Sequence, residues 1–227
     1  MSRQKILIPL WKRTTDVVLS SLAILVSAPL MLLVAAVIKL SSAGPIFYVA
    51  KRAGYRGQVF GQIKFRTMHT GADRQGAFTR KDDDRIFPAG RFLRLFRLDE
   101  LPQFFNVLRK EMSIVGPRPE DPTIVEQCYT QQQREVLNVL PGLTCLRQIR
   151  FFPDCSSLDC GSDSQRYYRE VILPQFLEMD LDYVRRQSFW LDFKIIILTA
   201  YLVLIKSWTA LLRRTRSKPA PVGTTAA

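Results

Sequence analysis

Gly90–Glu120 reads GRFLRLFRLDELPQFFNVLRKEMSIVGPRPE, and this stretch decides how the rest of the chain is interpreted. It contains two adjacent carboxylates, Asp99 and Glu100, and just beyond them Arg118, which has a proline on each side. Guanidinium groups bind phosphate, and carboxylates bind divalent cations. An acid pair close to a rigidly held cation therefore indicates phosphate and metal chemistry.

The segments on either side of the acid pair have the spacing of two short helices. Arg91–Leu98 is amphipathic, and Gln103–Lys110 predicts a second helix. One interpretation is that Asp99 caps the second helix and that Glu100 interacts favourably with its dipole. The surrounding cations favour a phosphate site instead. The candidate phosphate ligands are Arg118, Lys64, Arg94, Arg66 and Arg97.

Two of these cations belong to a segment with the pattern of a β-strand. Ile46–Ala50 and Val59–Met68 predict two short strands joined by a turn at Gly54–Gly57. Lys64 and Arg66 are two residues apart, so we expect them to share one face of the second strand. A solvated face is the simpler interpretation, but two cations near the acid pair suit contact with phosphate.

Pro117 and Pro119 enclose Arg118 in a Gly-Pro-Arg-Pro loop. Because proline fixes φ, this loop restricts the positions of the guanidinium and prepares it for a two-pronged contact with phosphate. A carboxylate can attack phosphorus, as in aspartyl-phosphate enzymes. Mg²⁺ is commonly held by one or two carboxylates together with substrate phosphates. The stretch thus contains residue types suited to each of these roles.

The composition indicates an anionic partner. The chain of 227 residues carries 33 basic and 20 acidic residues, a formal net charge of +13. The most basic zones flank the apolar stretches, which favours a membrane surface over a nucleic acid, and there is no nucleic-acid-binding motif. The four cysteines lack CxxC spacing and His69 is the single histidine, so a Cys/His zinc site is not expected.

Val17–Ile38 contains 22 residues without a charge, and a straight helix of that length, about 33 Å, would span a bilayer. Pro29 in its middle removes a backbone hydrogen bond, and Ser27 can bond back to a carbonyl near it. Both flanks are basic, whereas a spanning helix usually has more positive charge on one side. The residues leave two alternatives open: a kinked span, or a helix–break–helix that enters one leaflet and returns.

Towards the C-terminus the pattern is mostly helical. Thr123–Leu140 and Tyr167–Arg186 predict helices, the second broken at Pro174, and Leu143–Arg150 predicts a strand. Ile195–Ile205 is strongly apolar but has only 11 residues, which suits a core or interfacial helix. The basic residues after it suit an anionic lipid surface.

Taken together, these segments resemble the bacterial sugar transferases, the small monotopic polyprenyl-phosphate phosphoglycosyl transferases. The resemblance runs from about Lys12 to Leu212 and is specific because its pieces occur together and in order. They are KRTTDVVLSSLAILVSAPLMLLVAAVIKLSSAGPIFY, IKFRTM, the stretch quoted above, PGLT and LDYVRRQSFWLDFKIIILTA.

The resemblance implies a reaction and roles for residues. A UDP-sugar gives its sugar-1-phosphate to a membrane polyprenyl phosphate, in bacteria undecaprenyl phosphate, and UMP is released. Asp99 is implied as the covalent nucleophile, and Glu100, with Asp99 beside it, as the Mg²⁺ ligand. Lys64, Arg94 and Arg118 are implied at the site. The membrane segment is implied to be re-entrant and broken near Pro29, which selects the second alternative above.

The chain also departs from the family pattern. Ala28 stands where the family usually has serine before the proline, and Ser27 is one place earlier. After PGLT the run Cys145–Gln148 replaces the common glycine and aromatic residue, and residues 151–165 form an insert. Because these differences lie where sugar selection is expected, the sugar is not predicted; neither are the polyprenyl length, the glycan pathway or the oligomeric state.

We therefore expect an α+β fold: a helix-dominated single domain with a short β-hairpin. The expected divisions are a basic N-terminus and re-entrant membrane helix (1–40), a cytosolic catalytic domain with interfacial helices (41–212) and a basic, disordered tail (213–227). The expected location is the cytoplasmic face of the bacterial inner membrane, in contact with anionic lipids. The alternative is a non-catalytic polybasic module that recruits anionic lipid or a glycan-assembly partner.

Overall fold

The computed structural model describes residues 8–72, 83–150 and 164–216. In this part of the chain helices predominate over two small two-stranded sheets, which confirms a helix-rich fold with a β-hairpin. The elements are α1 (Leu10–Ser41), β1 (Phe47–Ala53), η1 (Tyr55–Gly57), β2 (Val59–Phe65), α2 (Pro88–Leu95), η3 (Leu98–Glu100), α3 (Gln103–Leu108), β3 (Ser113–Val115), α4 (Pro122–Cys128), η4 (Gln133–Asn138), β4 (Gly142–Thr144), α5 (Leu146–Arg150), α6 (Ser164–Tyr167), α7 (Leu173–Arg186) and α8 (Phe189–Arg216).

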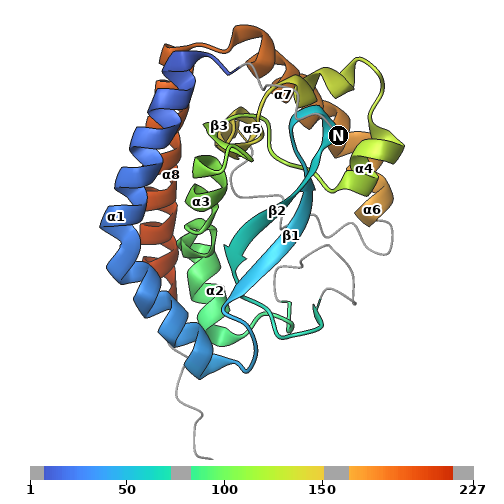
Figure 1. Ribbon diagram of the computed structural model, residues 1–227. Helices are drawn as coiled ribbons and strands as arrows, with labels where there is room; N and C mark the ends of the chain where they lie inside the picture. The colour runs from blue at the N-terminus through green and yellow to red at the C-terminus, as the bar shows by residue number, and fades with distance from the viewer. Residues whose placement is uncertain (1–7, 73–82, 151–163, 217–227) are drawn as a thin grey trace, which may run out of the picture.

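The long helix α1 forms one side of the molecule and is bowed (Figure 1). Between Leu10 and Ser41 the helix continues through Pro29, so the break expected there is not seen. The hydroxyl of Ser27 donates to the carbonyl of Ala23 at 2.6 Å, which confirms the expected bond back to the helix. α1 is long and apolar enough to cross a membrane, with a mean hydropathy of 2.6 over an 18-residue window.

Both ends of α1 pack against the rest of the fold. Near its start Lys12, Asp16 and Ser20 are buried, and near its end Val34 and Ile38 are buried. The last two join a hydrophobic cluster with Phe65, Phe87 and Leu93. Between these ends the helix presents exposed apolar side chains. The most exposed are Leu25 (74%), Val26 (70%), Leu32 (74%) and Leu33 (61%).

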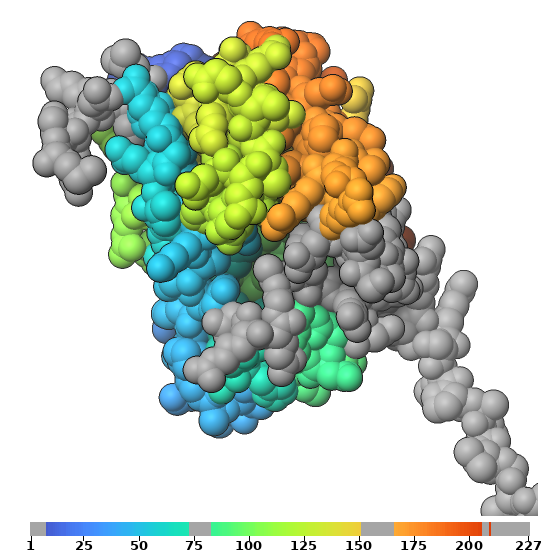
Figure 2. Space-filling view, turned by 90° about the vertical axis from the view of Figure 1, so that its right-hand side faces the viewer, coloured from blue at the N-terminus to red at the C-terminus, as the bar shows by residue number. Residues whose placement is uncertain are grey.

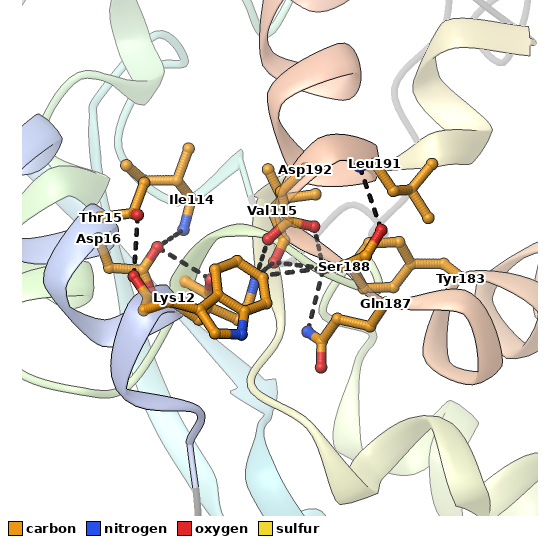
Figure 3. A network of polar contacts seen from close by, with 12 residues as sticks. Lys12, Thr15, Asp16, Ile114, Val115, Tyr183, Gln187, Ser188, Leu191 and Asp192 are labelled. Carbon is orange, nitrogen blue, oxygen red and sulfur yellow. Dashed lines mark hydrogen bonds and ion pairs between the residues drawn. The ribbon is translucent and has the colours of Figure 1, made fainter.

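A network of buried polar contacts fixes the start of α1 (Figure 3). The ammonium of Lys12 donates to the carbonyl of Val115 at 2.9 Å, to the hydroxyl of Tyr183 at 3.1 Å and to the carboxylate of Asp192 at 2.5 Å. The carboxylate of Asp16 accepts two hydrogen bonds from the first residues of β3. Removing one partner of such a pair leaves a buried charge uncompensated, so the network holds α1 to β3 and α8.

The hairpin is confirmed, with strands slightly different from those expected. β1 and β2 are antiparallel, and Tyr48 pairs with Lys64 while Arg52 pairs with Phe60. β1 extends to Ala53, and β2 ends at Phe65. Figure 2 shows that the hairpin (cyan to blue), α4 with η4 (yellow-green) and α7 (orange) make up much of the face opposite α1.

Some local predictions were wrong. The helix expected over Thr123–Leu140 is two short pieces, because α4 ends at Cys128 and the chain resumes as the tighter turn η4. The strand expected over Leu143–Arg150 is β4 followed directly by α5. β4 pairs in parallel with β3, a short strand that was not predicted.

The last helices differ from those expected. Pro174 lies in the first turn of α7, directly after a π-helical turn at Tyr168–Ile172, so the helix is distorted before Pro174 but is not broken there as predicted. α8 has 28 residues instead of the 11 expected. It continues to Arg216, so the first four residues of the expected disordered tail are helical. Residues 217–227, and residues 151–163 of the insert, lie outside the described residues.

Candidate active site

The acid pair lies in a tight turn between α2 and α3. Arg97 has a φ of 53°, in the left-handed region, and turns the chain after α2. The turn η3 follows, so Asp99 and Glu100 precede α3 rather than begin it. Leu98 and Leu101 pack against the cluster of Phe65, Phe87 and Leu93 and hold the turn from both sides. A non-glycine residue at positive φ is strained, and such strain collects at functional sites.

Glu100 is held by cations from two separate segments. The guanidinium of Arg97 donates to both carboxylate oxygens, at 2.9 and 3.0 Å, and Arg118 lies 4.0 Å from one of them. With its amide turned so that the oxygen faces these arginines, Gln148 accepts from both Arg97 and Arg118. Burial alone would raise the pKa of Glu100, but Arg97, Lys64 and Arg118 outweigh burial and lower it. Glu100 is therefore ionised at neutral pH.

Asp99 has a different environment from its neighbour. Burial and the charge of Glu100 raise the pKa of Asp99 to about 6, although Lys64, Arg94 and Arg97 oppose them. The three cations thus limit the rise in the pKa of Asp99 without cancelling it. Asp99 is still ionised at neutral pH, and its raised pKa makes it more basic than Glu100. Two carboxylates with pKa values pushed apart commonly have different roles.

Lys64 and Arg94 reach the acid pair from β2 and α2. Burial lowers the pKa of Lys64 to about 8, with Arg118 and Arg52 adding to the effect and Glu100 and Asp99 opposing it. The Nε of Arg94 donates to the hydroxyl of Thr67 at 2.8 Å, which orients its guanidinium. The negative charge of Asp99 raises the pKa of Arg94, although burial has the larger effect and lowers it. The structure therefore brings together Lys64, Arg94, Arg97, Arg118 and both acids.

Arg66 is placed elsewhere. It follows the end of β2, and its guanidinium donates to the carbonyls of Pro45 and Ser42 and to the hydroxyl of Ser42 at 2.5–2.8 Å. These contacts fasten the connection between α1 and β1. We therefore interpret Arg66 as a residue that holds the end of α1. Its guanidinium is buried against Ser42 and Pro45 and does not join Lys64 at the acid pair, where it was expected.

The Gly-Pro-Arg-Pro loop that carries Arg118 is fixed by a close backbone contact and by buried ion pairs next to it. A side chain on Gly116 would collide with the backbone of Leu140 and Gly142, so only glycine permits this close approach. Past the loop, Glu120 accepts from Arg147 at 2.8 Å, and Asp180 lies 3.6 Å from the same guanidinium. The sequence did not single out a site role for Gln148, Arg147 or Asp180. Their signal is their position, the first two after PGLT and the third directly before LDY.

The acid pair suits a divalent cation that is shared with a substrate. In the described ranges no group of three or more metal-binding side chains surrounds the site. Mg²⁺ binds readily to one or two carboxylates when phosphate oxygens and water supply its other ligands. Glu100 and Asp99 would provide those carboxylates. Because Arg97 already contacts both oxygens of Glu100, a cation would have to compete with that ion pair.

The sequence motifs and this geometry agree with comparisons to known proteins. A family model described as bacterial sugar transferase matches residues 8–206, which is most of the chain. The chain belongs to the bacterial sugar transferase family. The match begins just before α1 and ends within α8, so it includes the bowed helix, the hairpin and the acid pair.

Relatives within the bacterial sugar transferases carry names that describe their activity. A UDP-glucose:undecaprenyl-phosphate glucose-1-phosphate transferase from Caulobacter vibrioides is 38% identical over 199 residues, covering 86% of this chain and 70% of that protein. An undecaprenyl-phosphate glucose phosphotransferase from Komagataeibacter xylinus is 39% identical over 195 residues, covering 83% and 35%. The exopolysaccharide production protein ExoY of Sinorhizobium fredii is 42% identical over 157 residues, covering 61% and 68%.

The bacterial sugar transferases in this comparison differ in length and in the sugar they are named for. The match covers between 35% and 43% of several relatives, among them those from Xanthomonas campestris, Klebsiella pneumoniae and Aeromonas hydrophila. The relative from Aeromonas hydrophila is named for N-acetylgalactosamine and is 34% identical. These names therefore do not select one sugar.

Proposed function

We propose that this protein transfers sugar-1-phosphate from a UDP-sugar to a polyprenyl phosphate in the membrane, releasing UMP, as an early membrane step of a surface glycan pathway. The observation that carries this proposal is the pair of Asp99 and Glu100 among the cations Lys64, Arg94, Arg97 and Arg118. A purely lipid-binding basic surface gains nothing from two partly buried acids. The names of the relatives support the choice of donor and acceptor.

In the first step we assign Asp99 as the nucleophile. One of its carboxylate oxygens attacks the phosphorus that bears the sugar, and the bond from that phosphorus to the oxygen of UMP breaks. UMP leaves with the bonding electrons, and the sugar phosphate stays on Asp99 as an acyl phosphate. The raised pKa of Asp99 supports this role, because a more basic carboxylate is a better nucleophile while it remains ionised at neutral pH.

In the second step polyprenyl phosphate displaces Asp99. A phosphate oxygen of the lipid attacks the same phosphorus, the bond to Asp99 breaks, and the free carboxylate is restored. Arg118 and Lys64 would stabilise the negative charge on the phosphoryl oxygens in both steps. Mg²⁺, when bound by Glu100 and Asp99, would neutralise further charge on the diphosphate.

Glu100→Gln tests this division between the two acids. The amide loses the charge that binds Mg²⁺ but keeps the shape of the side chain, so we expect a lower rate and a higher Mg²⁺ requirement. Asp99 remains, so the covalent intermediate should still form, more slowly. The measurement is the initial rate of UMP release across a Mg²⁺ titration. An unchanged Mg²⁺ requirement would remove Glu100 from the metal site.

The catalytic residues are proposed to lie on the cytoplasmic face of the bacterial inner membrane, with α1 inserted into one leaflet from that side. Both ends of α1 pack against the rest of the fold, while its middle exposes apolar side chains. A helix that crossed the bilayer would separate its ends by the full membrane. The exposed apolar residues of α8, among them Trp190 (75%) and Leu204 (71%), suit the same interface with anionic lipids.

Single-cysteine labelling tests this topology. In a cysteine-free background, cysteines at Ser2 and Ala43 should both react with a membrane-impermeant reagent from the cytoplasmic side only. Ala43 is exposed and is preferred to Ser42, whose hydroxyl and carbonyl hold Arg66. A cysteine at Leu25 should be protected on both sides by lipid. Labelling of the two ends from opposite sides would establish a transmembrane span.

The direct test of the proposed function is a screen of UDP-sugars with detection of UMP. The full chain in lipid nanodiscs should release UMP only when the correct UDP-sugar, Mg²⁺ and, for multiple turnovers, polyprenyl phosphate are present. The product should carry both the sugar and a diphosphate. Absence of UMP with every UDP-sugar, in protein that binds anionic vesicles, would favour the non-catalytic polybasic module.

A further inference from the structure

Arg52, at the end of β1, is a cation that the reaction above does not use. It makes no hydrogen bond or ion pair with any residue that the structure describes, and its Nε is shielded from solvent without an acceptor. Its pairing with Phe60, and that of Tyr48 with Lys64, put Arg52 and Lys64 on one face of the hairpin. Ala50 and Gln62, between them on that face, are buried.

The end of β1 lies beside the loop that carries Arg118. The backbone N–H of Ala53 donates to the carbonyl of Glu120 at 2.9 Å, so Arg52 is next to a residue bonded to the end of the Pro-Arg-Pro-Glu run. Arg52 and Arg118 both help to lower the pKa of Lys64, after the larger effect of burial. Cations from β1, from β2 and from the loop that carries Arg118 therefore influence one another.

A shielded donor without an acceptor, beside two like charges, lowers the stability of the fold. Such a donor is commonly explained by a function, such as binding a ligand. The cations nearer the acid pair already have partners: Arg97 pairs with Glu100, and Arg94 bonds to Thr67. Arg52 is thus available to a ligand, and a group that satisfies an arginine Nε–H beside a lysine is an anion with several oxygens, such as a phosphate.

The donor carries two phosphates, and they need separate positions. The sugar-bearing phosphate must meet Asp99. Arg52 lies opposite Phe60, four residues along β2 from Lys64, so it stands nearer the closed end of the hairpin. The second phosphate, which stays with the nucleoside, would then extend past Lys64 towards the end of β1.

We propose that Arg52 binds the phosphate that leaves with the nucleoside, so that it holds the UDP end of the donor and the UMP product. This inference rests on the proposed function. Arg52→Gln removes the charge and the Nε–H while keeping much of the side-chain length. Because a charge-assisted hydrogen bond is lost, UMP should bind at least about tenfold more weakly to the variant.

The experiment is calorimetric titration of the full chain in nanodiscs with UMP and with uridine, in the presence of Mg²⁺. Arg52→Gln should weaken UMP and leave uridine unchanged, because uridine has no phosphate. Lys51→Gln is the matched control, since Lys51 is the adjacent residue, is exposed and points to the other face of the strand. Its UMP affinity should equal that of the wild type.

Wild-type affinity of Arg52→Gln for UMP would overturn the assignment of Arg52. If that variant also had a raised KM for polyprenyl phosphate, Arg52 would be assigned to the acceptor instead. Provided that the wild-type protein releases UMP during turnover, this outcome refutes only the role of Arg52. A wild-type protein that never releases UMP refutes the proposed function instead.

Folding is tested separately. Because Arg52 has no partner in the described part of the chain, Arg52→Gln should melt at or above the wild-type temperature. If this variant does not fold, Arg52→Lys keeps the charge and loses the two-pronged contact, and it should bind UMP more weakly than wild type. Wild-type UMP affinity in a folded Arg52→Lys protein, with Arg52→Gln unfolded, would make Arg52 a structural residue.

Discussion

Asp99→Asn is expected to abolish turnover, lowering the rate of UMP release by about three orders of magnitude or more. Asparagine keeps the size of the side chain but has no anionic oxygen to attack phosphorus. Asp99 is the acid with the raised pKa, and its neighbours Lys64, Arg94 and Arg97 remain in place to bind substrate. The loss should therefore appear in kcat, with UDP-sugar binding largely retained.

The same variant should also lose the single burst of UMP that the wild type produces without acceptor. Asp182→Asn is a suitable control, because Asp182 is an exposed acid on α7 that pairs only with Arg186 in the described part of the chain. It should keep both the burst and the turnover. A normal burst in Asp99→Asn would show that another group attacks the donor.

Arg118→Lys is expected to lower kcat/KM by about tenfold to a hundredfold. The lysine keeps the positive charge but cannot donate two parallel hydrogen bonds, and a charge-assisted hydrogen bond contributes about 1.5–3 kcal/mol. A difference of about 1.4 kcal/mol corresponds to tenfold in rate. Arg118 is partly exposed, 4.0 Å from Glu100 and bonded to Gln148, so it is aimed at the acid pair before substrate binds.

Arg109→Lys provides the matched control for Arg118→Lys. Arg109 is an exposed arginine directly after α3. Its guanidinium makes no hydrogen bond to a residue that the structure describes. Activity should not change in this variant. Wild-type kinetics of Arg118→Lys at limiting UDP-sugar would refute the two-pronged contact, whatever the control shows.

The acid pair and the hairpin could be predicted because their signals are local. Asp99 and Glu100 lie between two amphipathic segments, and the Gly54–Gly57 turn separates two runs with strand pattern. Lys64 was placed correctly for the same reason, since a strand fixes which side each residue faces. Arg118 could be predicted as a site residue from the two prolines beside it.

Other features depend on contacts between distant segments, and the sequence does not reveal those. Arg66 bonds to Ser42 and Pro45 across the end of α1, so a strand pattern placed it wrongly on the site. The roles of Gln148 and Arg52 likewise depend on residues that are distant in the sequence and near them only in the fold, so neither role could be predicted. The length of α8 was also missed: only Ile195–Ile205 was expected to be a helix, although no glycine or proline interrupts the chain from Phe189 to Arg216.

Intact and peptide mass spectrometry of the protein mixed with UDP-sugar and Mg²⁺, without acceptor, tests the covalent route most directly. We expect a sugar-phosphate adduct on Asp99 in the wild type and no adduct in Asp99→Asn. Added polyprenyl phosphate should discharge the adduct. An adduct on any other residue, or the absence of an adduct under every trapping condition from an enzyme that turns over, would contradict this expectation.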